Sequence, residues 1–138
     1  MSKLVRFSIS IDADLIDAFD SLSHETGYTN RSEAIRDAIR HRMVQREWES
    51  GDEVAGVITL LYDHHRPGLA ETLMEMQHHA LTEVISTTHV HFDANNCLEF
   101  IAVRGESHVI ESLANRMISL KGVKHGALTG TSTGKQLI

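Results

Sequence analysis

Residues 5–11 read Val-Arg-Phe-Ser-Ile-Ser-Ile, a strict alternation of apolar and polar side chains. Because successive side chains of a strand point to opposite faces, this pattern predicts a half-buried β-strand. Its polar face would carry Arg6, Ser8 and Ser10. A single strand cannot satisfy the hydrogen bonds of its own edges, so we expect it to pair antiparallel with the same strand of a second chain.

Two amphipathic helices are predicted to follow this strand. Asp12 or Asp14 can cap the first helix, and Gly27 is placed to end it. The second helix is expected to begin after Asn30, with Glu33 three residues further on as in a capping box. Each helix has one apolar stripe at helical spacing, formed by Leu15, Ala18, Phe19 and Leu22 in the first and by Ile35, Ala38, Ile39 and Met43 in the second.

A paired ribbon of this kind fits the DNA major groove. Arg6, Ser8 and Ser10 from both chains could then hydrogen-bond to base edges. The start of the second helix offers further contacts to phosphate from a helix N-terminus, through Asn30, Arg31 and Ser32. The alternative is that the polar face of the strand is only solvated.

Composition bounds the class of protein. The 138 residues carry a formal net charge of −6, which argues against a generally basic nucleic-acid binder. Residues 1–48 carry seven Lys and Arg against eight Asp and Glu, so a local basic face remains possible there. The single cysteine cannot form an internal disulfide. With no apolar run of about 18 residues and no signal-peptide pattern, we expect a cytoplasmic protein that is not in a membrane.

The rest of the chain predicts a second, α+β domain over residues 54–131, after a first domain over residues 1–48. A polar stretch, Gln45 to Glu53, would link the two, with Trp48 packed at the junction. The predicted elements are strand 54–62, helix 67–80, strands 84–93 and 97–104, helix 107–120 and strand 123–129. A β-α-β-β-α-β order is that of the ferredoxin-like, or split βαβ, arrangement. Residues 130–138 would form a flexible tail.

A candidate metal site lies in the second domain. His89 and His91 would project from one face of a strand, and a turn at Asp93–Asn96 could bring Cys97 beside them. Two imidazoles and one thiolate need one more ligand. Three imidazoles and a thiolate in a plane would suit Ni(II) or Cu(II), whereas a tetrahedral arrangement would suit Zn(II).

Together these motifs resemble a known family, the nickel-responsive transcriptional regulators. The first part of the resemblance, to the ribbon-helix-helix module, lies in Arg6–Asp12, in Leu22-Ser and in Gly27–Asp37. The second lies in Gln77–His79, His89–His91 and Cys97–Glu99. The similarity covers nearly the whole chain, apart from the residues before Arg6 and the tail after about Thr129.

The resemblance implies a dimeric ribbon-helix-helix module followed by a ferredoxin-like, ACT-like regulatory domain. It implies one Ni(II) per chain, bound by His89, His91 and Cys97 together with His78 from a neighbouring subunit. It also implies a homotetramer, built as a dimer of dimers, in which two ribbon dimers flank a core of four regulatory domains.

Further residues match supporting positions of the family. Around the metal they are Gln77, Tyr62 and Glu99. Glu33 and Asp37, one helical turn apart, match a possible second cation site between the domains. His64 matches a position tied to secondary metal binding, whereas His65 and His79 are open as further metal ligands, and His79 points about 100° away from His78 in a helix.

The expected function is repression of nickel-uptake genes by binding a double-stranded operator when Ni(II) is bound. A copper or zinc sensor of the same architecture is the nearest alternative. A nickel storage or delivery protein would account for the metal ligands but not for the Arg6, Ser8 and Ser10 strand. A metalloenzyme would need an open coordination position, which four protein ligands would close, so we expect no enzymatic activity.

Overall fold

The computed structural model describes residues 3–138 and divides into two compact units, Met1–Arg40 and His41–Ile138. Each unit is considered by itself. Among the described residues, no helix combines the length and the apolar character that crossing a membrane requires.

The first unit contains the two predicted helices. Helix α1 spans Ala13–Glu25, and helix α2 begins at Arg31 and runs to Glu49, into the second unit. Gly27 adopts a φ of 94°, the left-handed conformation that ends a helix, as predicted. Asn30 caps α2, because its Oδ1 accepts a hydrogen bond of 2.9 Å from the backbone N–H of Glu33. Asp12 stands at the N-cap of α1 but makes no capping bond with its side chain.

The predicted N-terminal strand is extended but unpaired in the single chain. Residues 3–12 carry no strand assignment. Val5, Phe7 and Ile9 are 75%, 70% and 65% exposed, so the apolar face of the segment is open to solvent. The strand pairing predicted from the alternation is therefore not formed within one chain. The physical reason is that residues 3–40, the described part of this unit, supply no second strand, which leaves a large apolar surface to be covered by another molecule.

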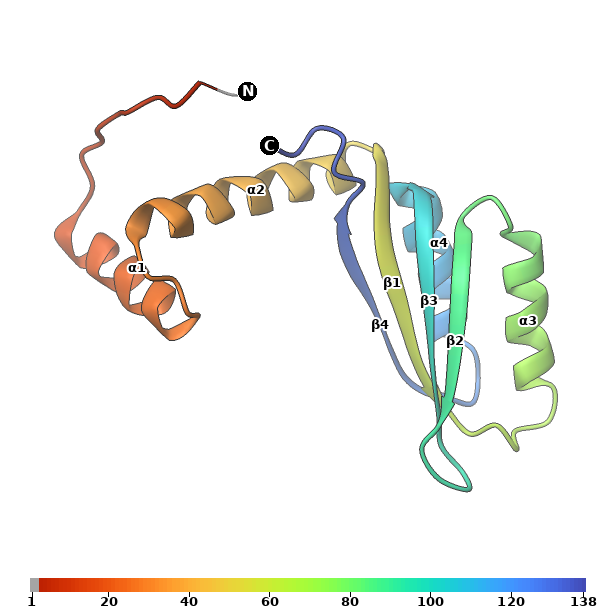
Figure 1. The fold of residues 1–138 in the computed structure, drawn as a ribbon. Coiled ribbons are helices and arrows are strands. Elements are labelled where there is room, and N and C mark those ends of the chain that lie inside the picture. The colour runs from red at the N-terminus through yellow and green to blue at the C-terminus, as the bar shows by residue number, and fades with distance from the viewer. Residues whose placement is uncertain (1–2) are drawn as a thin grey trace. The chain divides into compact units, whose positions relative to one another are not determined.

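The second unit is a four-stranded antiparallel sheet with two helices (Figure 1). The strands are β1 (Glu53–Tyr62), β2 (Val84–His91), β3 (Cys97–Glu106) and β4 (Val123–Ser132), and the helices are α3 (Leu69–His79) and α4 (Ser107–Ile118). The spatial order β2-β3-β1-β4 is that of the split βαβ arrangement. The predicted α+β class and ferredoxin-like order are confirmed.

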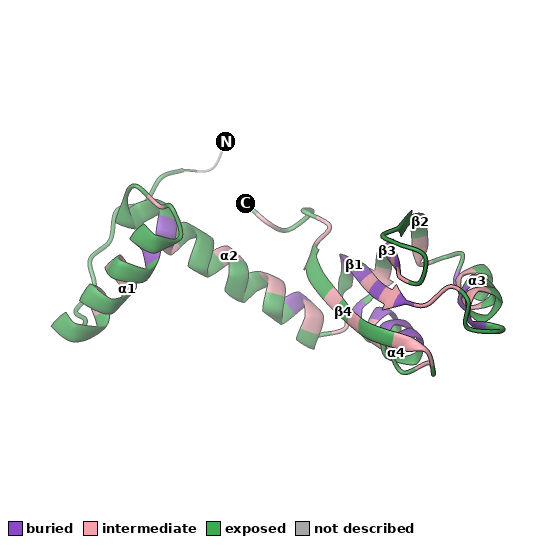
Figure 2. Cartoon of the chain, turned by 90° about the horizontal axis from the view of Figure 1, so that it is seen from below, coloured by how far each residue is buried: buried purple, intermediate pink, exposed green. Residues whose placement is uncertain are grey.

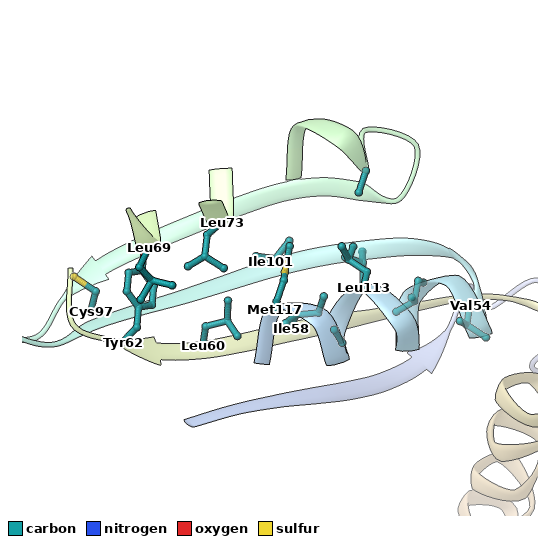
Figure 3. Packing of buried hydrophobic residues seen from close by; sticks show 14 residues of the cluster. Val54, Ile58, Leu60, Tyr62, Leu69, Leu73, Cys97, Ile101, Leu113 and Met117 are labelled. Carbon is teal, nitrogen blue, oxygen red and sulfur yellow. The ribbon is translucent and has the colours of Figure 1, made fainter. Parts of the chain in front are cut away.

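Alternation along the central strands decides where the core lies. On β1, every second residue from Val54 to Tyr62 is buried, and both helices pack against this face. Figure 2 shows that burial is concentrated on β1, β3 and α4. Figure 3 shows the side chains that meet there, including Leu60 and Ile101 from the sheet and Leu73 and Met117 from the helices.

Within the second unit, all of whose residues are described, no helix covers the opposite face of the sheet. Val57, Val90 and Phe100 belong to this face and are exposed. The register places them together, because Thr59, two residues from Val57, pairs with Phe100, and Val90 pairs with Leu98. An exposed apolar sheet face of this kind favours association with another molecule.

Several element boundaries differ from those predicted. Helix α2 continues to Glu49, so the polar stretch that begins at Gln45 is largely helical and only the turn before β1 interrupts the chain. Gln, Arg and Glu are good helix formers, which explains why a polar stretch can remain helical. Strand β4 extends to Ser132, so the first residues of the predicted flexible tail belong to the sheet. Trp48 packs against the core of the second unit.

The core predicts the effect of a matched pair of substitutions on α4. Ile110 is fully buried, whereas its neighbour Val109 is 42% exposed. We expect Ile110→Ala to lower the free energy of unfolding by about 2–5 kcal/mol, since it removes buried methylene groups and leaves a cavity. Val109→Ala should cost less than about 1 kcal/mol. Urea unfolding at one fixed chain concentration measures both, and equal losses would contradict this placement of the core.

Candidate metal centre and DNA-binding face

The β2–β3 hairpin places the predicted metal ligands together. His91 pairs with Cys97, and His89 pairs with Glu99, so all four side chains lie on the face of the sheet that the helices cover. The turn between the strands is held by Asp93, whose Oδ1 accepts bonds of 2.8 Å from the backbone N–H groups of Asn95 and Asn96. The turn predicted from the polar stretch is thus formed.

Cys97 is the centre of this group. Its Sγ lies 3.3 Å from Nδ1 of His91, and the rings of His89 and His91 have centroids 4.9 Å apart. The thiol is fully buried, and burial raises its pKa above the ordinary value. A buried thiolate is therefore unfavourable by itself, and a bound cation would supply the positive charge that stabilises it.

His64 also lies at this site. Its Nδ1 is 3.0 Å from Sγ of Cys97, and its ring centroid is 5.0 Å from that of His91. The ligand atoms of His64, His91 and Cys97 all lie within 4.8 Å of one another. Burial, and then the neighbouring His65 and His91, lower the pKa of His64, which favours the neutral imidazole that can bind a metal.

In the sequence, His64 was indicated as a metal-binding residue only by the resemblance to the nickel-responsive regulators. The signal that places it lies in the sheet, because Tyr62, the last residue of β1, pairs with Cys97. His64 comes two residues after Tyr62, so its side chain can reach Cys97 on the neighbouring strand. A second group, formed by Asp63, His64 and His65, also has its ligand atoms within 4.8 Å.

His78 is not brought to the other predicted ligands within one chain. It lies in the last turn of α3 and is exposed, and no group of three close ligand atoms among residues 3–138 includes it. His79, next to it, is exposed as well. A role for His78 at this site would therefore require a second copy of the chain.

The three predicted supporting residues form one hydrogen-bonded network beside His89. The Tyr62 hydroxyl donates to Oε2 of Glu99 at 2.7 Å, and Nε2 of Gln77 donates to Oε1 at 2.8 Å. The same hydroxyl lies 3.3 Å from Nδ1 of His89, which leaves Nε2 of that ring for a metal. Burial, and then the Glu99 carboxylate, raise the pKa of Tyr62, so its hydroxyl keeps its proton as a donor.

The predicted DNA contacts lie on exposed surfaces of the first unit. Arg6, Ser8 and Ser10 are exposed along the extended segment, and Ser32 is exposed at the start of α2. Arg31 is paired with another side chain, as described next.

Arg31 forms a two-pronged ion pair with Asp20 of α1. Its Nε lies 3.0 Å from Oδ1 of Asp20 and its Nη2 lies 2.5 Å from Oδ2. The hydrogen bond and charge of Arg31 lower the pKa of Asp20. The pair fixes the direction of the guanidinium but leaves it half-exposed.

Glu33 and Asp37, the possible second cation site, are bonded within the chain. Glu33 pairs with Arg36, and Asp37 accepts a hydrogen bond from Tyr28. No group of three close metal-ligand atoms in the described part of the chain includes either residue.

The donor set suits a borderline metal ion. One sulfur and several imidazole nitrogens favour Ni(II), Cu(II) or Zn(II) over the hard cations Mg²⁺ and Ca²⁺, which prefer oxygen ligands. The lowered pKa of His64 and the hydrogen bond that leaves Nε2 of His89 open favour metal binding, whereas the Cys97 thiol must release its proton to become a ligand.

Known proteins share both units. Residues 55–131 match the family described as the NikR C terminal nickel binding domain, and residues 5–46 match the ribbon-helix-helix proteins of the copG family. A relative from Pyrococcus abyssi is 55% identical over 98% of this chain and 99% of its own length. One from Geobacter sulfurreducens is 50% identical over 99% of both. Both carry the name nickel-responsive regulator. The chain therefore belongs to the family of nickel-responsive regulators, in which a ribbon-helix-helix module precedes a nickel binding domain.

Proposed function

We propose that this protein is a repressor that binds the operators of nickel-uptake genes when Ni(II) occupies its regulatory domain. The observation that carries the proposal is the gathering of His89, His91 and Cys97 on one face of the hairpin, with the Glu99 network behind His89. The family supplies the link from this site to DNA, through the ribbon-helix-helix module in the same chain.

The metal site is proposed to be shared between chains, with one Ni(II) per chain. His89, His91 and Cys97 would bind it from one subunit and His78 from a neighbour. Apolar side chains flank His78 on the surface, since Met74 is 63% exposed and Leu81 is 71% exposed. Together with the uncovered face of the sheet, they offer the apolar area that a homotetramer would bury.

The DNA module is proposed to act as a dimer. Pairing of two N-terminal strands would cover the exposed Val5, Phe7 and Ile9 and present Arg6, Ser8 and Ser10 as one ribbon. Asn30, Arg31 and Ser32 would contact the flanking phosphates. Because the proposed operator is part of the chromosome, the protein would act in the cytoplasm.

Metal binding would be coupled to DNA binding because two ribbons must bind two half-sites of the operator at once. A shared metal site ties occupancy to the arrangement of the subunits, and that arrangement decides whether both ribbons can reach DNA. Metal and DNA would then each raise the affinity for the other by the same factor. Glu33 and Asp37 could hold a second cation in this state only after exchanging their present partners, which are Arg36 for Glu33 and Tyr28 and Arg40 for Asp37.

Selectivity for nickel would not come from affinity alone. Copper binds N and S ligands at least as tightly as nickel, so geometry and availability in the cell would select the cognate metal. The proposal includes no enzymatic activity, because four protein ligands leave no open position for a substrate.

The first test is binding of the purified protein to DNA upstream of a nickel-uptake operon, with and without one Ni(II) per chain, at one salt concentration. We expect nickel to raise the affinity at least about tenfold. His89→Ala and Cys97→Ala should abolish this gain, whereas His24→Ala, which removes an exposed histidine of α1, serves as the matched control.

Equal affinity in both states would remove the metal control from the proposal. Stoichiometric nickel binding without any specific footprint would instead favour storage or delivery, and a gain with Cu(II) or Zn(II) but not Ni(II) would identify a different sensor.

Nickel affinity should rise with pH. Burial raises the pKa of the Cys97 thiol, so the thiol is protonated near neutral pH and must release its proton when the metal binds. Protons compete for the sulfur at lower pH, and the apparent affinity should therefore increase about tenfold from pH 7 to pH 8. Chelator competition at each pH measures this change. A flat profile would mean that the thiolate already exists in the metal-free protein.

The Tyr62 network predicts a loss of nickel affinity in Tyr62→Phe. The substitution keeps the ring but removes the hydroxyl that bonds to Glu99 and faces His89. We expect the affinity to fall about tenfold, as is typical when a group behind a metal ligand is lost. Tyr28→Phe removes the other tyrosine hydroxyl of the chain and should leave nickel affinity unchanged. Equal affinities of the two variants would show that the network does not tune the site.

A further inference from the structure

The end of α2 is built into the regulatory unit. Trp48, in the last turn of this helix, lies against Gly130 of β4 so closely that a Cβ on this glycine would be 2.6 Å from the indole ring. The indole Nε1–H donates a hydrogen bond of 3.0 Å to the carbonyl oxygen of Thr131. Strand β4 thus holds the side chain of Trp48 by both packing and a hydrogen bond.

Ser107 holds the backbone at the same place. This residue begins α4 directly after β3 and is fully buried. Its hydroxyl donates to the carbonyl oxygen of Trp48 at 2.7 Å, and its backbone N–H donates to that of Asp52 at 3.0 Å. One residue therefore ties both the last turn of α2 and the turn into β1 to the regulatory domain.

Glu47 also connects the end of α2 to the regulatory unit. It is only 8% exposed, and its Oε1 accepts a hydrogen bond of 3.3 Å from the hydroxyl of Ser132. The backbone N–H of Asp52 also donates to the carbonyl oxygen of Glu47, at 3.1 Å. The turn between α2 and β1 is short and bonded on both sides, unlike a free linker.

These contacts have a consequence for signal transfer. The same helix begins in the DNA-binding unit, as Arg31–Arg40, and ends in the regulatory unit. A pivot at the Ser50–Asp52 turn would require the hydrogen bonds of Trp48 and Ser107 to break. With this turn held, a rotation of the regulatory unit carries the last turns of α2 with it.

We propose that Trp48, Ser107, Glu47, Thr131 and Ser132 form a junction clamp whose members are positioning residues for the coupling of metal to DNA binding. The clamp makes the last turns of α2 part of the regulatory domain, so the arrangement of these domains is passed into the helix that enters the DNA module. This inference rests on the proposed nickel-dependent function. It assigns these residues no contact with either metal or DNA.

The test separates coupling from the binding of either ligand. In full-length protein, Trp48→Ala and Ser107→Ala open the clamp. Trp48→Phe keeps a smaller aromatic ring but loses the N–H group, and Ser119→Ala is the matched control. Ser119 stands at the other end of α4, and its hydroxyl donates to the carbonyl oxygen of Arg116, one turn earlier in the same helix. The measurements are nickel affinity, DNA affinity with and without nickel, and hydrogen exchange at the amide of Asp52.

We expect Trp48→Ala and Ser107→Ala to bind nickel within about twofold of the wild type while losing about tenfold of the nickel-induced gain in DNA affinity. Exchange at Asp52 should accelerate, and Trp48→Phe should restore most of the gain. If Trp48→Ala does not fold, the nickel-induced gain in DNA affinity of Ser107→Ala decides whether the clamp is needed. A full gain in the opened variants would overturn the clamp alone, whereas no gain in the wild type would overturn the proposed function as well.

Discussion

The pairing of β2 with β3 is the constraint on which the chemistry of this protein depends. It sets His91 opposite Cys97 and His89 opposite Glu99, and a slip of one residue would turn every one of these side chains to the other face of the sheet. The Asp93 turn fixes this register with short hydrogen bonds to the backbone. The same register gives the proposed metal site its candidate ligands and the carboxylate beside them, so neither can be moved without the other.

Both units of a single chain leave apolar surface uncovered, and in each case the surface lies beside a functional group. In the N-terminal segment, the exposed apolar face lies opposite the polar face that carries Arg6. On α3, the exposed Met74 lies one turn before His78. Burial of apolar area is worth about 25 cal/mol per Å², so assembly would be driven by these surfaces and not by the polar groups. In the proposed tetramer, assembly and function would therefore depend on the same elements, and a regulator built in this way would respond to changes in its own association.

Much of the fold could be predicted from sequence because its signals are local. The alternation in residues 5–11, the Asn30 cap and the order of six elements after Val54 each follow from neighbouring residues, and the sheet order and the cap are formed as expected. The place of His64 could not be predicted in this way. It depends on the pairing of Tyr62 with Cys97, which are far apart in the chain, and no local pattern near His64 reports that pairing.

The end of α2 shows why a polar stretch is a weak guide to a linker. Gln45, Arg46 and Glu47 are polar, yet they favour a helix, and in the fold the carboxylate of Glu47 becomes buried against β4. Only the tertiary contacts of Trp48 and Ser107 distinguish a fixed junction from a flexible one. Because a helix fixed at one end transmits rotation whereas a loop absorbs it, these few contacts would decide whether the proposed metal site can influence the DNA module.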